Sequence, residues 1–328
     1  MDRPCARTAY LILMPPEASH MAFLFPGQGS QKLGMGYDLA HREPRAMDIF
    51  HLADEILGYS LSALCWDGPE AALNETEHTQ PALLTHSVAV LEVLRQRMPH
   101  PTAAFVAGHS LGEFSASVMA EALEFPAALR LVRARGLAMK EAGRLSPGGM
   151  AAVLGLSIEQ VEAACRQASS QEKGEVWVAN DNCPGQVVIS GDEAALEAAG
   201  PLLEKAGARR VIRLAVSIPA HSPRMQAAQS QFHQTLQQTP IRDPAIPVIG
   251  NVSAAPLKDA AALRRDLEAQ LTSRVRWRES IEYMVSHGVD TFFEVGSGTV
   301  LAGLVRRIAS HAQAISLDAP GTLGALAD

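Results

Sequence analysis

Basic charge, cysteine and long apolar runs are all scarce in this sequence. Its 28 Lys and Arg are outnumbered by 35 Asp and Glu, which gives a formal net charge of -7. A chain without a basic excess offers no broad field to offset phosphate repulsion, so a nucleic-acid partner is not expected. The 4 cysteines stand far apart without paired spacing, which predicts neither a metal site nor a disulfide framework. A reducing, cytoplasmic location fits this pattern best.

The one apolar run near the start does not predict a membrane span. Residues 9–14 are too few to cross a bilayer, and Pro15 and Pro16 follow them directly. We expect residues 1–20 to be a loose N-terminal extension, with the folded part of the chain beginning at Met21. A hydrophobic content of 47% with 19% charged residues then predicts an ordinary globular protein without a membrane partner.

Strand patterns and helix patterns alternate along most of the chain, which predicts an α/β fold. A mostly parallel sheet covered by helices on both faces follows from that alternation. From residue 147 to 216 the elements become short and follow the order βαββαβ, which is typical of a ferredoxin-like unit. We therefore expect a large α/β domain from residues 21–146 and 217–328, with a small ferredoxin-like α+β domain from 147 to 216 inserted between them. The strands expected in the large sheet are 22–25, 105–108, 246–252 and 291–296, and the main helices are 79–97, 114–122, 126–139, 223–237, 259–271 and 300–309.

The most informative stretch runs from Phe105 to Glu113. An apolar strand pattern ends in Gly108-His109-Ser110-Leu111-Gly112, and a helix pattern follows. Gly-x-Ser-x-Gly between a strand and a helix is typical of a nucleophile elbow, in which two glycines allow a sharp turn that exposes the serine hydroxyl. Ser110 is therefore the candidate nucleophile.

A serine nucleophile needs a base and donors for the negative charge that it creates. His109 is tied to the elbow backbone, so His221, in Pro219-Ala220-His221-Ser222 after the strand pattern 209–216, is the leading candidate base. The glycine-rich segment 26–31 exposes backbone N–H groups and lacks the Lys-Ser/Thr ending of a P-loop. It is better suited to an oxyanion hole than to a phosphate site.

Arg135 lies on the predicted helix 126–139, beside the apolar positions Leu131 and Met139. An inward guanidinium would need an anionic partner, such as a substrate carboxylate held by two parallel hydrogen bonds. The pattern alone favours the plainer interpretation, an arginine on the surface.

Taken together, these motifs resemble those of the malonyl-CoA:acyl carrier protein transacylases and the related acyltransferase domains of polyketide synthases. The resemblance runs from Met21 to about Leu317 and implies a hydrolase-like fold for the large domain, which would be the catalytic one. The motifs that carry it are Phe25-Pro26-Gly27-Gln28-Gly29-Ser30-Gln31, Thr79-Gln80-Pro81-Ala82, Gly108-His109-Ser110-Leu111-Gly112-Glu113, Arg135-Gly136, the segment 180–191, Pro219-Ala220-His221-Ser222 and Glu294-Val295-Gly296-Ser297-Gly298.

The resemblance implies a role for each matching residue. Ser110 would be the acylated nucleophile and His221 its base, and Arg135 would bind the free carboxylate of the malonyl group, against the surface interpretation. The oxyanion hole would be formed by backbone N–H groups, and a backbone carbonyl would orient the histidine in place of an Asp. The remaining matches are Gln28 and Leu111 for the oxyanion hole, Gln270 for the carbonyl, and His109, Gln80 and Asn182 around the substrate pocket.

The implied reaction is transfer of malonyl from malonyl-CoA to the phosphopantetheine thiol of an acyl carrier protein, by ping-pong through a malonyl-serine ester, in fatty acid or polyketide synthesis. No metal and no cofactor besides the coenzyme A thioester substrate are expected, and the family default is a monomer. Ala220 is small, as in methylmalonyl-specific relatives, but family analogy still favours malonyl. The alternatives are an acyl hydrolase that clears carrier proteins, which would have no use for Arg135, and a non-catalytic scaffold, which intact motifs disfavour.

An acidic carrier protein docking on an acidic chain would need a local basic patch. Two arginine pairs are candidates, one before the His221 segment and one after the last glycine motif. Ordinary solvated surface charge explains them equally well. The four residues are Arg209, Arg210, Arg306 and Arg307.

Overall fold

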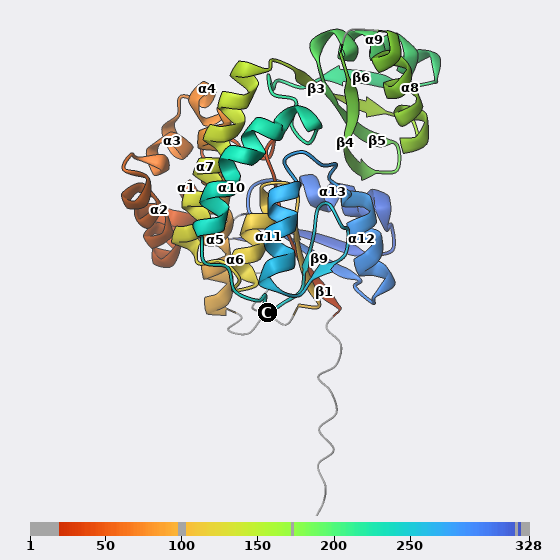
Figure 1. The fold of residues 1–328 in the computed structure, drawn as a ribbon. Coiled ribbons are helices and arrows are strands. Elements are labelled where there is room, and N and C mark those ends of the chain that lie inside the picture. Colours follow the sequence, from red (N-terminus) through yellow and green to blue (C-terminus); the bar gives the residue numbers. More distant parts are fainter. Residues whose placement is uncertain (1–19, 98–102, 172–173, 319–320, 323–328) are drawn as a thin grey trace, which may run out of the picture.

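Six strands form the larger sheet of the computed structural model, which describes residues 20–97, 103–171, 174–318 and 321–322. Every neighbouring pair is parallel except the last, where β8 runs antiparallel to β7, so the predicted mostly parallel sheet is confirmed. β1 lies in the interior of this sheet between β2 and β9. Figure 1 shows β1 and β9 side by side beneath the helices. The predicted extension 1–20 lies, apart from His20, outside the described residues. In sheet order the strands are β10 (Gln313–Leu317), β9 (Thr291–Val295), β1 (Met21–Phe25), β2 (Phe105–Gly108), β7 (Val248–Ile249) and β8 (Pro256–Leu257).

Side chains of β1 alternate between two separate cores, as the period of a strand requires. Phe23 and Phe25 belong to one core and Ala22 and Leu24 to the other. Both faces of the sheet are therefore covered by helices. The first core is shared with α5 (Thr76–Arg97), α6 (Gly112–Met119), α7 (Phe125–Leu145), α10 (Gln226–Gln238) and α11 (Ala260–Ala269), and the second with α12 (Trp277–Ser286) and α13 (Val300–Ile308).

The beginning of α5 differs from the prediction. The helix was expected to open near Thr79 with Pro81 in its first turn, but it begins at Thr76 and contains Pro81. Proline has no N–H to donate to the carbonyl four residues earlier, which here belongs to Glu77. The Arg133 Nη1 donates to that carbonyl instead, at 2.6 Å, so the helix tolerates the proline.

Before α5 lie four short helices that the sequence analysis did not predict. They cluster at one side of the molecule, away from the small sheet (Figure 1). No helix of the described residues has the length and apolar character that a membrane span requires. The four are α1 (Tyr37–Arg42), α2 (Pro44–Leu57), α3 (Leu61–Asp67) and α4 (Glu70–Leu73).

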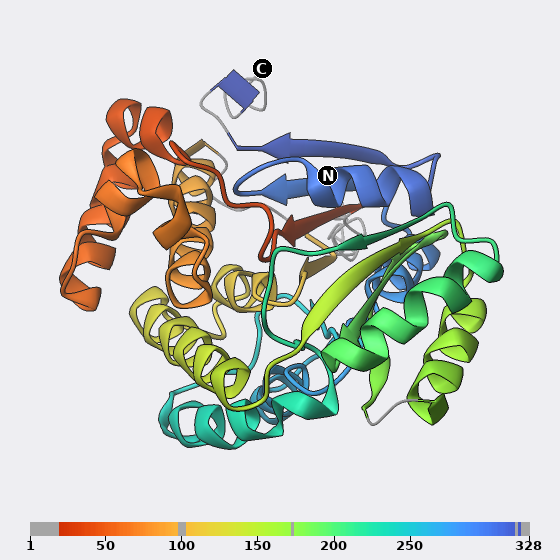
Figure 2. The ribbon, with the colours of Figure 1, turned by 90° about the horizontal axis from the view of Figure 1, so that it is seen from above.

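The second sheet has four strands and is antiparallel throughout, in the order β4-β5-β3-β6. Two helices pack on it and enclose a core of their own, and both views show them side by side (Figure 2). The chain order is the predicted βαββαβ, and the small antiparallel unit is confirmed; its limits at 147 and 216 stay a prediction. The elements are β3 (Gly149–Leu154), α8 (Ile158–Gln171), β4 (Val176–Cys183), β5 (Gln186–Gly191), α9 (Glu193–Lys205) and β6 (Arg210–Arg213).

Two predicted strands are shorter than expected. The strand 209–216 ends at Arg213, where its partner β3 nears its own beginning, and the chain then crosses without strand pairing toward His221. The strand 246–252 shrinks to Val248–Ile249 because Pro247 has no N–H to give to a ladder and a turn begins at Asn251.

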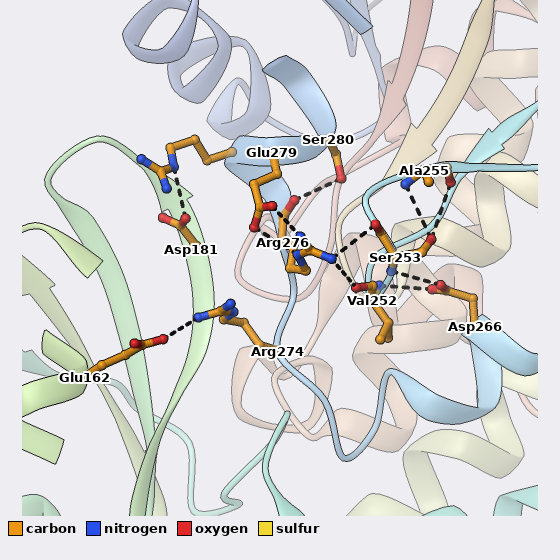
Figure 3. A network of polar contacts seen from close by, with 11 residues as sticks. Glu162, Asp181, Val252, Ser253, Ala255, Asp266, Arg274, Arg276, Glu279 and Ser280 are labelled. Carbon is orange, nitrogen blue, oxygen red and sulfur yellow. Dashed lines mark hydrogen bonds and ion pairs between the residues drawn. The ribbon is translucent and has the colours of Figure 1, made fainter. Parts of the chain in front are cut away.

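The two sheets are joined through β4. Val275, in the segment before α12, exchanges backbone hydrogen bonds with two β4 residues: its N–H donates to the Ala179 carbonyl at 2.8 Å, and its carbonyl accepts from the Asp181 N–H at 2.9 Å. The Arg274 guanidinium forms an ion pair with Glu162 of α8 at 2.8 Å (Figure 3). A cleft is thereby held between the small sheet and the carboxyl ends of the large one, which is where α/β sheets bind their ligands.

Candidate active site

The nucleophile elbow joins β2 to α6. Ser110 has a φ of 50°, the left-handed conformation that non-glycine residues rarely adopt. Gly108 has no room for a side chain, since a Cβ there would overlap the carbonyl carbon of Gly112. The Asn251 side chain forms two hydrogen bonds with the backbone of the turn: its Oδ1 accepts from the Ser110 N–H at 2.8 Å, and its Nδ2 donates to the Gly108 carbonyl at 2.7 Å. The strained backbone is thus fully hydrogen-bonded, and the Ser110 hydroxyl projects into the cleft.

His221 reaches the Ser110 hydroxyl from the opposite wall. Its Nε2 lies 2.9 Å from the Ser110 Oγ, and its Nδ1 lies 2.7 Å from the Gln270 carbonyl oxygen. A carbonyl can only accept, so Nδ1 carries the proton and Nε2 is the free acceptor. His221 also has a left-handed backbone, with φ 59°. The three residues that the sequence assigned to nucleophile, base and base orientation are therefore brought together from three separate elements.

The surroundings keep this imidazole uncharged. Burial, and next the positive charge of Arg135, lower the pKa of His221 to about 3. A neutral imidazole with Nε2 facing a serine hydroxyl is ready to take its proton.

Arg135 lies inside the protein, so the surface interpretation is wrong: the side chain is 1% exposed. Its Nη2 donates to the Ser110 Oγ at 3.1 Å and to the Gln270 Oε1 at 2.7 Å, and its Nη1 donates to the Gln80 Oε1 at 2.8 Å. All these acceptors are uncharged, and within the described part of the chain no carboxylate forms an ion pair with it. Burial lowers the pKa of Arg135 to about 10, which still leaves it a cation at neutral pH.

The glycine-rich loop after β1 lies against the elbow. β1 and β2 pair in parallel with Phe25 opposite Gly108, so both strands end at the same edge. A Cβ on Gly27 would overlap the His109 carbonyl oxygen, and this close approach brings Gln28 beside the nucleophile. Gln28 and Leu111 both line the cleft, and in the described ranges neither backbone N–H has an acceptor. Two N–H groups are therefore free to bind an oxyanion.

Of the three remaining residues expected around the pocket, His109 and Asn182 line the cleft and Gln80 lies behind it. The His109 Nε2 lies 2.9 Å from the Asn182 Oδ1, so the elbow is linked to β4 of the small sheet, and both side chains line the cleft. Gln80 is fully buried behind Arg135, where its Nε2 donates to the Thr76 Oγ1 at 2.8 Å, and it does not line the cleft.

The cavity above Ser110 measures about 410 Å³ and is mostly apolar away from the reacting groups. Its walls come from β3, β5, the crossing segment after β6 and the beginning of α13. Nowhere in residues 20–97, 103–171, 174–318 and 321–322 do three or more His, Cys, Asp or Glu side chains gather as a metal site. The apolar lining consists of Met139, Met150, Ala152, Val188, Leu214, Val216, Ile218, Ala220, Val300, Leu301 and Leu304.

The four arginines considered for docking are all exposed, but they are not equivalent. Arg306 donates to the Ala314 carbonyl at 2.7 Å, and Arg307 donates to the Pro184 carbonyl at 3.0 Å. Both therefore also fix local structure. Arg209 and Arg210 stand at the beginning of β6.

Two residues at the site were given no role by the sequence analysis. Asn251 was taken as part of a strand, although Gly-Asn at a strand end is a common turn signal. Glu113 was quoted only as part of the elbow motif, yet an acidic residue among the apolar positions of a buried helix was an available signal, because such a group must find partners.

Comparison with known proteins agrees with this geometry. The family model described as acyl transferase domain matches residues 22–319. The chain is 45% identical over 298 residues to a malonyl CoA-acyl carrier protein transacylase of Haemophilus influenzae (90% of this chain, 95% of the relative), and 44% identical over 305 residues to one of Bacillus subtilis (93% and 95%).

Solved structures give the same result. An acyl carrier protein S-malonyltransferase of Vibrio cholerae superposes with a TM-score of 0.90 at 41% identity, covering 94% of this chain and 100% of that one. A malonyl-transacylase in complex with its type II PKS acyl-carrier protein superposes with a TM-score of 0.88 at 40% identity, covering 93% and 98%. An elbow serine, a facing histidine and these matches along nearly the whole chain lead to one conclusion: the chain belongs to the acyl transferase domain family.

Proposed function

We propose that this enzyme transfers a malonyl group from malonyl-CoA to the phosphopantetheine thiol of an acyl carrier protein, through a malonyl ester of Ser110. The names of its relatives support this reaction, and the structure of a relative with its carrier protein supports the partner. The observation that carries the proposal is the position of Ser110 Oγ, 2.9 Å from the His221 Nε2 and 3.1 Å from the Arg135 Nη2. A base and a buried cation, which has no carboxylate partner among the described residues, lie within one short acyl group of the nucleophile.

In the first half-reaction, Ser110 Oγ attacks the thioester carbonyl while its proton passes to the His221 Nε2. The carbonyl oxygen becomes an oxyanion that the N–H groups of Gln28 and Leu111 bind, each lowering the barrier by about 3 kcal/mol. The intermediate collapses to the serine ester, and the coenzyme A thiolate leaves with the proton from His221. In the second half-reaction the carrier thiol attacks the ester by the reverse path.

Arg135 selects acyl groups that end in a carboxylate. Two parallel N–H bonds suit that group, and an acetyl group would leave the buried cation uncompensated. The same contact assists the base. Because the charge of Arg135 helps to lower the pKa of His221, a bound carboxylate offsets that charge and raises the basicity of the imidazole when the right substrate is present.

The test is the intact mass of the protein after brief exposure to malonyl-, methylmalonyl- or acetyl-CoA, followed by addition of a holo acyl carrier protein. We expect a malonyl adduct on the wild type, none on Ser110→Ala, and transfer of the adduct to the carrier. The amount of methylmalonyl adduct relative to malonyl adduct measures whether the small side chain of Ala220 leaves room for the extra methyl group. Rapid loss of the adduct as free acid before the carrier is added would instead favour a hydrolase.

A further inference from the structure

A fully buried carboxyl group lies directly beneath the catalytic dyad. Glu113, in the first turn of α6, has no exposed surface. Its Oε2 accepts two hydrogen bonds, from the Asn251 Nδ2 at 2.8 Å and the Gln270 Nε2 at 2.6 Å. Within the described part of the chain no N–H or O–H donor bonds its Oε1, no Lys, Arg or His forms an ion pair with it, and the carboxyl group within hydrogen-bond reach is that of Asp266. A buried charged carboxylate normally recruits more donors than these two neutral amides.

The two amides that Glu113 binds are the ones that position the reacting groups. Asn251 holds the backbone of Ser110 through its Oδ1. Gln270 orients His221 through its backbone carbonyl and accepts from the Arg135 Nη2 through its Oε1. The Glu113 carboxyl group is thus connected to Ser110 through Asn251, and to His221 and Arg135 through Gln270.

Glu113 also helps to set which way the Gln270 amide faces: the Gln270 Nε2 donates to the Glu113 Oε2 at 2.6 Å and, more weakly, to the Ser110 carbonyl at 3.3 Å. If the Gln270 side chain were flipped, its NH₂ group would face the guanidinium of Arg135, and two donors would oppose each other. An acceptor at the Glu113 Oε2 draws the NH₂ group to the other side. The Gln270 oxygen is then left for Arg135, and the guanidinium is fixed in the plane that a carboxylate must meet.

The charge state of Glu113 follows from its neighbours. The carboxyl group of Asp266 lies beside it. Asp266 itself accepts from the backbone N–H groups of Val252 and Ser253 at 3.1 Å and 3.2 Å (Figure 3). Burial, and next the charge of Asp266, raise the pKa of Glu113 well above its usual range. Arg135 is the cation whose charge favours ionisation of Glu113, and the Gln270 side chain stands between them.

We propose that Glu113 is a positioning residue that works as the neutral acid: it fixes the amides of Asn251 and Gln270 while leaving the charge of Arg135 for the substrate carboxylate. An ionised Glu113 would compensate Arg135 from within the protein and repel an incoming anion. The inference rests on the proposed function for the identity of that anion.

Two substitutions separate the roles of shape and charge. Glu113→Gln keeps an acceptor oxygen for both amides and turns its own NH₂ toward Asp266, so it imitates the neutral acid. We expect its kcat/KM for malonyl-CoA to stay within about threefold of the wild type. Glu113→Ala removes the acceptor, and we expect kcat to fall by roughly 10- to 100-fold, with a lower preference for malonyl- over acetyl-CoA.

The matched control is Glu294→Gln. Glu294 is also a buried glutamate that accepts two N–H groups, from Leu301 and Ala302, but it touches neither Asn251 nor Gln270. Its substitution should leave the malonyl-to-acetyl ratio unchanged. If Glu113→Ala lowers only the melting temperature while kcat and this ratio stay at wild-type values, the role is structural and the proposal fails. If Glu113→Gln is folded but as impaired as Glu113→Ala, the ionised form is required and the proposal also fails.

Infrared spectroscopy tests the charge state without substrate. At pH 7.5, we expect the wild type to show the C=O stretch of a protonated carboxyl group, shifted by ¹³C-labelled glutamate, absent from Glu113→Gln and retained in Glu294→Gln. A labelled wild type without any such band overturns the neutral form even if no variant folds. A wild type that shows the band but never forms a malonyl adduct would refute the proposed function and leave the protonation of Glu113 standing.

Discussion

Replacing Arg135 by alanine should change which acyl group the enzyme prefers, not only how fast it works. The wild-type guanidinium is 1% exposed, and among the residues that the structure describes it bonds to neutral acceptors alone, so a substrate carboxylate would be the first anionic partner it meets there. Removing one member of a buried, hydrogen-bonded ion pair costs about 3 to 5 kcal/mol. At 1.36 kcal/mol per factor of ten, kcat/KM for malonyl-CoA should fall by roughly 10²·² to 10³·⁷. For acetyl-CoA it should rise, because no cation is left uncompensated.

The ratio of the two kcat/KM values is the decisive quantity. Arg135 also donates to the Ser110 Oγ at 3.1 Å, so its loss could slow the nucleophile toward every thioester. That effect is common to both substrates and cancels in the ratio. Arg130→Ala, at an exposed position of the same helix, is the control and should change neither value. If Arg135→Ala lowers both values by the same factor, the arginine serves the serine and the carboxylate argument is refuted.

Three further perturbations test other parts of the structure. Burial lowers the pKa of His86 to about 4, so as the pH falls below 6.5 the unfolded protein gains a proton at this residue and the folded protein does not. Between pH 6.5 and 4, the free energy of unfolding of the wild type should therefore fall by about 1.4 kcal/mol per pH unit more than that of His86→Leu. Urea titrations at several pH values measure both slopes, and equal slopes would contradict this. Gly108→Ala should cost about 3 kcal/mol or more by overpacking the elbow. Gly200→Ala, inside α9 and with open space around it, should instead raise the urea midpoint slightly, because alanine favours a helix over glycine by about 0.5 to 1 kcal/mol; similar costs for both would rule out the steric explanation. Arg210→Glu should raise KM for the carrier protein without altering acylation by malonyl-CoA. Arg45→Glu, on the exposed side of α2, should leave KM for the carrier protein unchanged, and an unchanged KM in Arg210→Glu would exclude this docking surface.

The elements that the sequence predicted well are those whose patterns are local. The strand at residues 105–108 and the elbow after it depend on a short apolar run and two glycines, and β2 has the predicted limits. The βαββαβ order was equally visible because each element alternates or repeats within its own length. β10 and the short helices between Tyr37 and Leu73 were not predicted, since their packing against the rest of the fold, not a strong pattern of their own, determines them.

At the site, too, the residues within local motifs were predicted and those that depend on distant contacts were not. Ser110 and His221 each lie in a short motif of neighbouring residues, so the sequence identified them as the candidate nucleophile and the candidate base. Arg135 could not be placed from its helix pattern, because a guanidinium beside apolar residues fits either face, and only the resemblance placed it inward. Asn251 and Glu113 contribute through contacts with residues more than a hundred positions away, and no local pattern reports such a contact.

The place of β1 between β2 and β9 has a consequence during synthesis. β2 follows β1 within about 80 residues, but β9 begins about 265 residues after β1 ends. At 5 to 20 residues per second, a ribosome needs roughly 13 to 53 s to supply it. Throughout that interval one edge of an apolar strand, Met21–Phe25, has unpaired backbone groups open to other chains. The centre of the finished sheet is therefore the part of the nascent protein that stays exposed to misassembly longest.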